Sequence, residues 1–120
     1  MTLLENRMTN VEPNQAKFEQ TVLEIWHAAH GVDQSEISTT WGKDRIAVLV
    51  ENVLFKAEKL LAESKEGSKM VGKYVHDLMC EALNEEMNIL SEIAQREIAS
   101  FSVSVDPTAS CLMIVFKSKA

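Results

Sequence analysis

Two histidines in the N-terminal third of the chain have a spacing that suits metal binding. His27 and His30 lie three residues apart, with Glu24 and Asp33 close by in sequence. On a helix this spacing brings two imidazoles toward one ion, with a carboxylate as a third ligand. Two histidines at a helix end also interact favourably with the helix dipole without a metal. Since the segment contains no third histidine or cysteine, we favour the metal-free interpretation, expect no cofactor, and keep His27 and His30 as the candidate ligands.

A second pair, His76 and Cys80, combines a thiol with an imidazole four residues away. On a helix the imidazole could activate the thiol as a nucleophile. The pair lies within an apolar stripe, and neither a Gly-rich turn nor a helix N-terminus accompanies it to stabilise an oxyanion. We therefore favour packing and expect no enzyme and no catalytic residue.

The string from Gly67 to Tyr74, GSKMVGKY, matches the phosphate-loop pattern except at its last position. There Tyr74 replaces the Ser or Thr that holds magnesium. A phosphate loop follows a buried strand, whereas residues 57–66 are helical in pattern and charged. We interpret Gly67 as a helix break and Gly72 as a close-packing position in the next helix.

Five lysines flank Gly67 and could meet an anionic partner or lipid headgroups. They are Lys56, Lys59, Lys65, Lys69 and Lys73. Three glutamates are interleaved with them: Glu58, Glu63 and Glu66. A mixed, solvated surface is therefore the simpler interpretation.

Periodicity predicts the elements that position these residues. Apolar residues at helical spacing follow Pro13, which suits a helix start, and Gly31 ends the run. Alternation then predicts a hairpin of strands at 37–41 and 46–50. The apolar face of the helix consists of Phe18, Val22, Ile25, Trp26 and Ala29.

A short helix ending near Gly67 and a long helix over about 71–94 follow, and two strands at 101–105 and 111–116 close the chain. We predict an α+β fold: a two-layer sandwich with a four-stranded antiparallel sheet and helices on one face, in the order α-β-β-α-α-β-β. Residues 1–14 are mostly polar and are expected to form a flexible N-terminal arm. Residues 15–120 form the single domain.

Composition excludes several classes of protein. The 120 residues are 46% hydrophobic and 25% charged, which is typical of a folded domain. Twelve basic against 18 acidic residues give a net charge of −6, which disfavours nucleic-acid binding. Because no segment is apolar enough to span a bilayer or to act as a secretory signal, we expect a cytoplasmic protein without membrane insertion.

The last strand and the two cysteines suggest how the chain behaves in solution. Residues 111–116 are apolar on both sides of the strand, and such surplus apolar surface favours a homodimer. Cys80 and Cys111 lie in apolar stretches, so we expect buried free thiols in a reducing compartment, with one disulfide between them as the alternative.

From Asp44 onward the sequence resembles a small bacterial family known as the C component of a sodium-translocating, membrane-potential-generating system. The resemblance rests on Asp44-Arg45-Ile46, the segment 54–61, Gly67, Asp106 and Val115-Phe116. Phe55 stands where the family has Thr, so the chain looks like a divergent member. The resemblance implies a soluble accessory protein of a membrane ion or inorganic-carbon system.

Three function hypotheses from different classes follow, of which an enzyme built on His76 and Cys80 is the third. The first is a non-enzymatic accessory or regulatory protein acting through protein–protein contacts. The second is a small ligand- or metal-binding sensor with a pocket near His27, His30 and Trp41.

Overall fold

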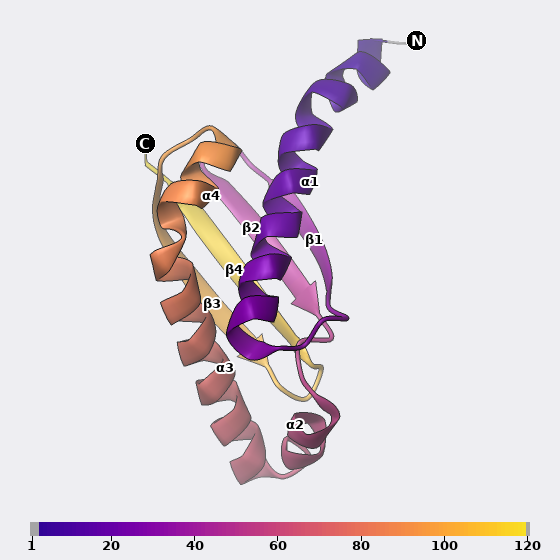
Figure 1. Ribbon diagram of the computed structural model, residues 1–120, viewed down its shortest axis with the longest axis vertical. Helices are drawn as coiled ribbons and strands as arrows, with labels where there is room; N and C mark the ends of the chain where they lie inside the picture. Colours follow the sequence, from indigo (N-terminus) through magenta and orange to yellow (C-terminus); the bar gives the residue numbers. More distant parts are fainter. Residues whose placement is uncertain (1–2, 120) are drawn as a thin grey trace.

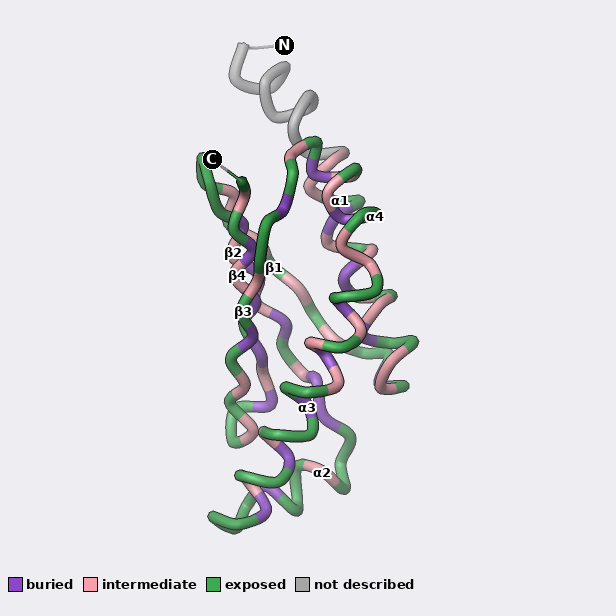
Figure 2. The backbone as a smooth tube through the Cα atoms, turned by 90° about the vertical axis from the view of Figure 1, so that its left-hand side faces the viewer, coloured by how far each residue is buried: buried purple, intermediate pink, exposed green. Residues whose placement is uncertain are grey.

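The computed structural model describes the backbone of residues 3–119 and the side chains of residues 14–119. Helices lie on one side of a sheet, so the domain has two layers (Figures 1 and 2). The elements in chain order are α1 (Leu3–His30), β1 (Glu36–Trp41), β2 (Arg45–Glu51), α2 (Lys56–Leu61), α3 (Lys65–Glu85), α4 (Met87–Ala94), β3 (Ile98–Asp106) and β4 (Cys111–Ser118). This arrangement confirms the predicted fold class.

The sheet has the strand order β1-β2-β4-β3, and every neighbouring pair is antiparallel. The strongly apolar β4 therefore lies between two strands. β1 and β3 are the edges. The crossover from β2 to β3 is made by α2, α3 and α4, which brings the last hairpin back beside the first.

The core lies between the two layers. Phe18, Val22 and Trp26 are fully buried on one face of α1, as their four-residue spacing predicts. The Phe18 ring meets Trp41 and Phe116 edge-on, with centroids 5.3 and 5.4 Å apart. The central strands contribute Ile46, Val48, Val50, Leu112, Ile114 and Phe116.

The predicted long helix is interrupted once. At Glu86 the backbone has φ −115° and ψ 12°, and its N–H donates to the carbonyl of Leu83 over 3.0 Å. This tighter turn separates α3 from α4 and redirects α4 across α1, where Leu90 is fully buried. The apolar residues of the predicted helix remain on the core side. Fully or largely buried are Val71, Val75, Met79, Leu83, Leu90 and Ala94, and half-buried are Leu78, Ala82 and Met87.

The interpretation of Gly67 as a helix break is wrong. Gly67 lies in the first turn of α3, and the break falls at residues 62–64. Ser64 caps the helix because its hydroxyl accepts the Gly67 N–H at 3.0 Å. A Cβ at Gly67 would lie 1.8 Å from the Leu61 carbonyl oxygen, so glycine is needed for close approach. Gly72 does pack closely, since a Cβ there would lie 3.2 Å from Pro107.

The predicted helix start at Pro13 is also wrong, because α1 begins at Leu3 and contains Pro13. Strong helix formers in residues 3–12, among them Leu, Glu, Arg and Met, outweigh the missing periodicity. That residues 1–14 act as a flexible arm stays a prediction. Residues 1, 2 and 120 lie outside the described residues.

Candidate functional site

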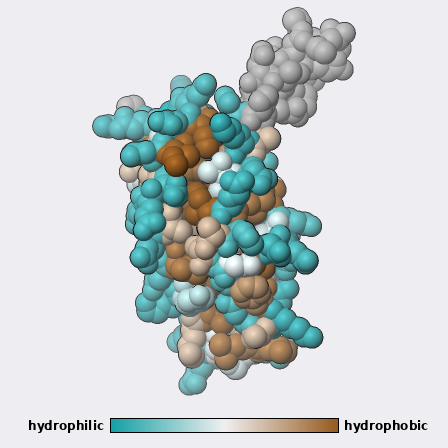
Figure 3. Space-filling model, viewed as in Figure 1, coloured by the Kyte–Doolittle hydropathy of each residue, from teal (hydrophilic) through white to brown (hydrophobic). Residues whose placement is uncertain are grey.

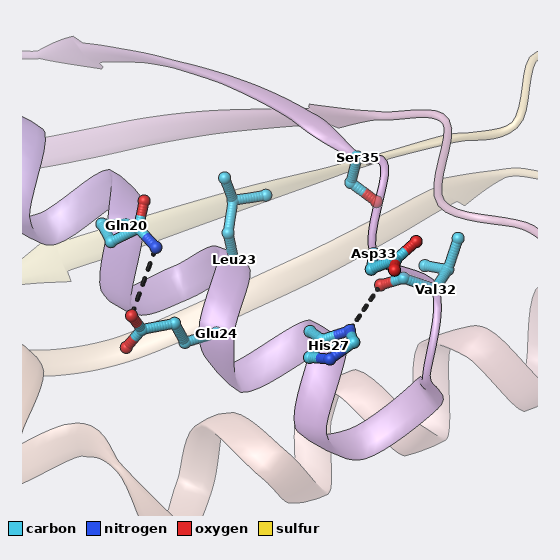
Figure 4. A pocket seen from close by; sticks show the side chains of 7 residues that line it. All are labelled: Gln20, Leu23, Glu24, His27, Val32, Asp33 and Ser35. Carbon is cyan, nitrogen blue, oxygen red and sulfur yellow. Dashed lines mark hydrogen bonds between the residues drawn. The ribbon is translucent and has the colours of Figure 1, made fainter.

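A pocket opens between the second half of α1 and the loop that leads into β1 (Figure 4). Its cavity volume is about 370 Å³. The lining residues are Gln20, Leu23, Glu24, His27, Val32, Asp33 and Ser35. Carboxylate, imidazole, amide and hydroxyl groups thus surround one leucine, which would suit a small polar ligand.

His27 is the imidazole of this pocket. Its Nδ1 lies 3.2 Å from the Val32 carbonyl oxygen, which can only accept a hydrogen bond. Nδ1 therefore carries a proton and donates this hydrogen bond, and in the neutral ring Nε2 is an acceptor. Beside it, the Gln20 amide donates to Glu24 over 3.2 Å. The exposed His27 thus offers the pocket one nitrogen lone pair.

His30 faces a different environment. Its side chain is 1% exposed and is stacked between Trp26 and Phe55, with ring centroids 4.6 and 4.7 Å away. The Val32 N–H donates to Nδ1, so the proton lies on Nε2 and is donated to the Glu58 carboxylate at 2.8–2.9 Å. This contact fastens the end of α1 to α2.

The structure does not bring His27 and His30 together on one ion. Both nitrogens of His30 are engaged within the protein, whereas His27 faces the pocket. Among the described residues, no group of three His, Cys, Asp or Glu side chains is placed to hold a metal. Trp41 is not among the pocket residues. It packs on Phe18, and the Arg96 guanidinium lies 5.3 Å above its ring.

His76 and Cys80 do lie side by side on the outer part of α3. The Cys80 Sγ is 3.7 Å from His76 Nε2, and His76 Nδ1 is 3.1 Å from Asp77. Lys73 donates to Asp77 over 2.6 Å, and this hydrogen bond lowers the pKa of the Asp77 carboxyl. The pKa of Cys80 is raised, mainly by partial burial and then by the charge of Asp77. A raised thiol pKa lowers the fraction of thiolate, the nucleophilic form, at neutral pH.

The phosphate-loop match has no loop to support it. Gly67, Gly72 and Lys73 all lie within α3, and the preceding element is the helix α2 rather than a strand. The backbone N–H groups of a helix interior are bonded to carbonyls and cannot cradle a phosphate. The string is therefore a helical segment.

The sheet face turned away from the helices is uncovered (Figure 2). Burial alternates along β2 and β4, which places the less buried members of each strand on this face. Leu49 is paired with Met113, and Ala47 is paired with Val115. These four residues form an apolar centre, in which Met113 is 45% exposed.

Charges of opposite sign lie at the two ends of this face. By the same alternation, Glu51 and Asp106 flank Cys111 at one end, because Cys111 is paired with both of them. Glu36 is paired with Glu51 on its other side and extends this acidic row to β1. Arg45 and Lys117 are paired at the other end. Cys80 and Cys111 are free and half-exposed rather than buried as predicted. The separation of acidic and basic residues to opposite ends of this face was not predicted, because the sequence does not give the strand register.

Comparison with known proteins gives one family match. The model of the family described as Na⁺-translocating membrane potential-generating system (MpsC) matches residues 10–119. The match includes α1 from residue 10 onward and β1, which lie before the segment that carried the sequence resemblance. No curated protein matches the sequence. Within residues 3–119, no helix has both the length and the apolar character needed to cross a bilayer.

Proposed function

The chain belongs to the MpsC family, and on this basis we propose that it is a cytoplasmic, non-enzymatic accessory protein that works through protein contacts as a homodimer. The system it serves is the Na⁺-translocating, membrane-potential-generating system after which the family is described. The observation that carries the proposal is the uncovered, apolar and charge-polarised face of the sheet.

The apolar centre of this face favours burial against another surface. Leu49 and Met113 lie on the two central strands, which pair in a continuous antiparallel register. Each Å² of such surface removed from water contributes about 25 cal/mol. Ser102 and Ser104 of β3 and Ser38 of β1 border the centre without charge. The surface is therefore suited to close packing.

The charges at the two ends favour a second copy as the occupant. A twofold axis between two facing sheets, perpendicular to the strands, places the acidic end of each copy against the basic end of the other. The same axis sets the larger pair Leu49 and Met113 over the smaller pair Ala47 and Val115. A self-complementary patch is what a twofold dimer requires.

The geometry of Cys80 supports a non-enzymatic role. A nucleophilic cysteine needs a lowered thiol pKa, whereas burial raises that of Cys80. Its imidazole neighbour His76 lies on the same exposed helix face. Packing and hydrogen bonding within α3 thus explain both residues.

Thiol modification tests the dimer with an internal control. Cys111 lies on the proposed interface and Cys80 lies on α3, and the variants Cys80→Ser and Cys111→Ser allow each thiol to be followed alone. We expect alkylation of Cys111 to slow as the protein concentration rises, while alkylation of Cys80 keeps its rate. A Cys111 rate independent of concentration would contradict the dimer.

A cellular measurement tests the accessory role. In the native cell, Met113→Glu is expected to lower the Na⁺-dependent membrane potential, because it introduces a charge into the apolar centre. Cys80→Ser is expected to leave the potential unchanged. Loss of the potential in Cys80→Ser, with Met113→Glu unaffected, would point to chemistry at the thiol instead.

The pocket at His27 supports the alternative, a small ligand- or metal-binding sensor. Its polar lining and the acceptor nitrogen of His27 are the observations in favour. Metal analysis of the purified chain separates the two candidates. Stoichiometric metal that is lost in His27→Ala would favour the sensor over the accessory protein.

A further inference from the structure

The end of the molecule formed by residues 55–74 exposes apolar side chains beside lysines. This segment contains Phe55, α2, the turn at 62–64 and the first part of α3, and we refer to it as the α2–α3 tip. It lies at the far end from the chain's C-terminus (Figure 1). We propose that the α2–α3 tip docks on the surface of a lipid bilayer that contains anionic lipids.

The α2–α3 tip exposes most of the large apolar side chains that are exposed among the described residues. Leu60 is 58% exposed and Met70 is 65% exposed. The five large apolar residues that the tip leaves exposed are Phe55, Leu60, Leu61, Met70 and Tyr74. Only two other described residues, Ile89 and Met113, are large, apolar and comparably exposed. Apolar side chains are visible at this end between hydrophilic ones (Figure 3).

The charged part of the tip has the opposite sign to the chain as a whole. Five lysines and three glutamates give residues 55–74 a net charge of +2, or +1 when Asp77, which accepts a hydrogen bond from Lys73 over 2.6 Å, is counted with them, whereas the whole chain carries −6. One of the glutamates, Glu58, is turned inward to His30 and the Phe55 N–H. Lysines beside exposed leucine and aromatic side chains are the combination that anionic bilayer surfaces attract.

The fold holds these side chains outward. Close approach of Gly67 to the Leu61 carbonyl fixes α2 against the start of α3. His30 stacks on Phe55, and its ring centroid is 6.4 Å from that of Tyr74. On α3, Val71 and Val75 take the core positions, and the neighbouring Met70 and Tyr74 are exposed.

The shape of the tip favours a bilayer over a protein partner. Leu60 and Leu61 project from α2, and Met70 and Tyr74 project from the first part of α3. Of the five exposed apolar residues, Phe55 alone lines a pocket, together with Lys56 and Lys59. Aromatic rings such as Phe55 and Tyr74 suit the headgroup region, where one part of the ring is apolar and another is wet. The proposal rests on the tip alone and does not depend on the sheet-face dimer.

Vesicle flotation of the purified full-length chain tests the proposal. We expect the chain to float with vesicles of phosphatidylcholine and phosphatidylglycerol, to float weakly with phosphatidylcholine alone, and to be released by salt. Leu60→Ser is expected to weaken binding about tenfold, because a leucine no longer enters the bilayer. Lys69→Gln is expected to weaken it about fivefold, as one cation near an anionic surface contributes.

Matched variants elsewhere provide the controls. Ile89→Ser removes a comparably exposed apolar residue from α4, and Lys43→Gln removes a lysine from the turn between β1 and β2. Both are expected to bind like the unmodified chain. Met70→Ser serves as the apolar test if circular dichroism shows that Leu60→Ser is misfolded.

Three results would overturn the proposal. The chain could fail to float with phosphatidylglycerol vesicles at low salt. The two control variants could lose as much binding as the tip variants. Finally, Leu60→Ser could change the self-association of the chain, which would mean that a second copy covers the tip.

Discussion

Replacing Gly67 by alanine tests how the α2–α3 tip is built. The Cβ of the new side chain would lie 1.8 Å from the Leu61 carbonyl oxygen and 2.8 Å from the Ser64 hydroxyl oxygen. The carbonyl is part of the backbone, so the overlap cannot be relieved by a rotamer change. Either α2 or the first turn of α3 must move, and the Ser64 cap is disturbed.

The expected magnitude is the difference between two opposing effects. Alanine in place of glycine stabilises a helix by about 1 kcal/mol. Overpacking costs about 1–3 kcal/mol, and a backbone overlap of this size belongs at the upper end. The free energy of unfolding should therefore fall by about 2 kcal/mol for Gly67→Ala.

Urea denaturation followed by circular dichroism measures this difference. Gly72→Ala is the matched control on the same helix, because its Cβ would meet only Pro107 at 3.2 Å. The control should be neutral or stabilising, since helix propensity favours alanine and the proline ring can shift slightly. If Gly67→Ala proved as stable as Gly72→Ala, the close approach of α2 and α3 would be refuted.

Three further outcomes are expected. His30→Ala should lower the free energy of unfolding by about 2–3 kcal/mol in urea titrations, because it removes two ring stacks and the hydrogen-bond partner of Glu58. Ser110→Ala should cost about 1–3 kcal/mol in the same assay, since the Ser110 hydroxyl accepts the buried Leu54 N–H at 3.2 Å. The alkylation rate of Cys80 should increase with pH, and the midpoint of this increase should lie above 9.0, the ordinary pKa of a thiol. A midpoint below 9.0 would show that the thiol is activated.

The strands and the sheet could be predicted because their signal is local. Ile46, Val48 and Val50 alternate with less buried residues, and this pattern alone indicates which face is covered. β4 is apolar on both faces, which predicts a central position in the sheet. The two hairpins and the helical layer on one face were predicted in this way, whereas the pairing of β4 with β2 rather than with β1 has no local signal.

The helix boundaries that the sequence misplaced depend on contacts distant in sequence or on backbone geometry. Because glycine is a poor helix former, the sequence predicts a break at Gly67, whereas in the structure Gly67 allows the Leu61 carbonyl to approach closely. The break at Glu86 leaves the apolar periodicity on either side intact and has no glycine or proline to mark it. The close approach at Gly67 and the helix break at Glu86 therefore could be identified only from the three-dimensional structure.

The candidate site was predicted least well. The three-residue spacing of His27 and His30 correctly places them near one helix end, but their rings turn to different partners. Glu58, the partner of His30, lies 28 residues away and carries no local signal. The charges that polarise the uncovered sheet face were readable in the sequence, whereas the register that aligns Glu51 with Cys111 was not.

Sedimentation equilibrium of the full-length chain tests most directly whether the uncovered sheet face joins two copies. The unmodified chain should have the mass of two chains at micromolar concentration, and Met113→Glu should have the mass of one. Leu60→Ser, which alters the tip and leaves the sheet unchanged, should remain a dimer. A monomeric unmodified chain, or a Met113→Glu variant that still dimerises, would contradict the proposed interface.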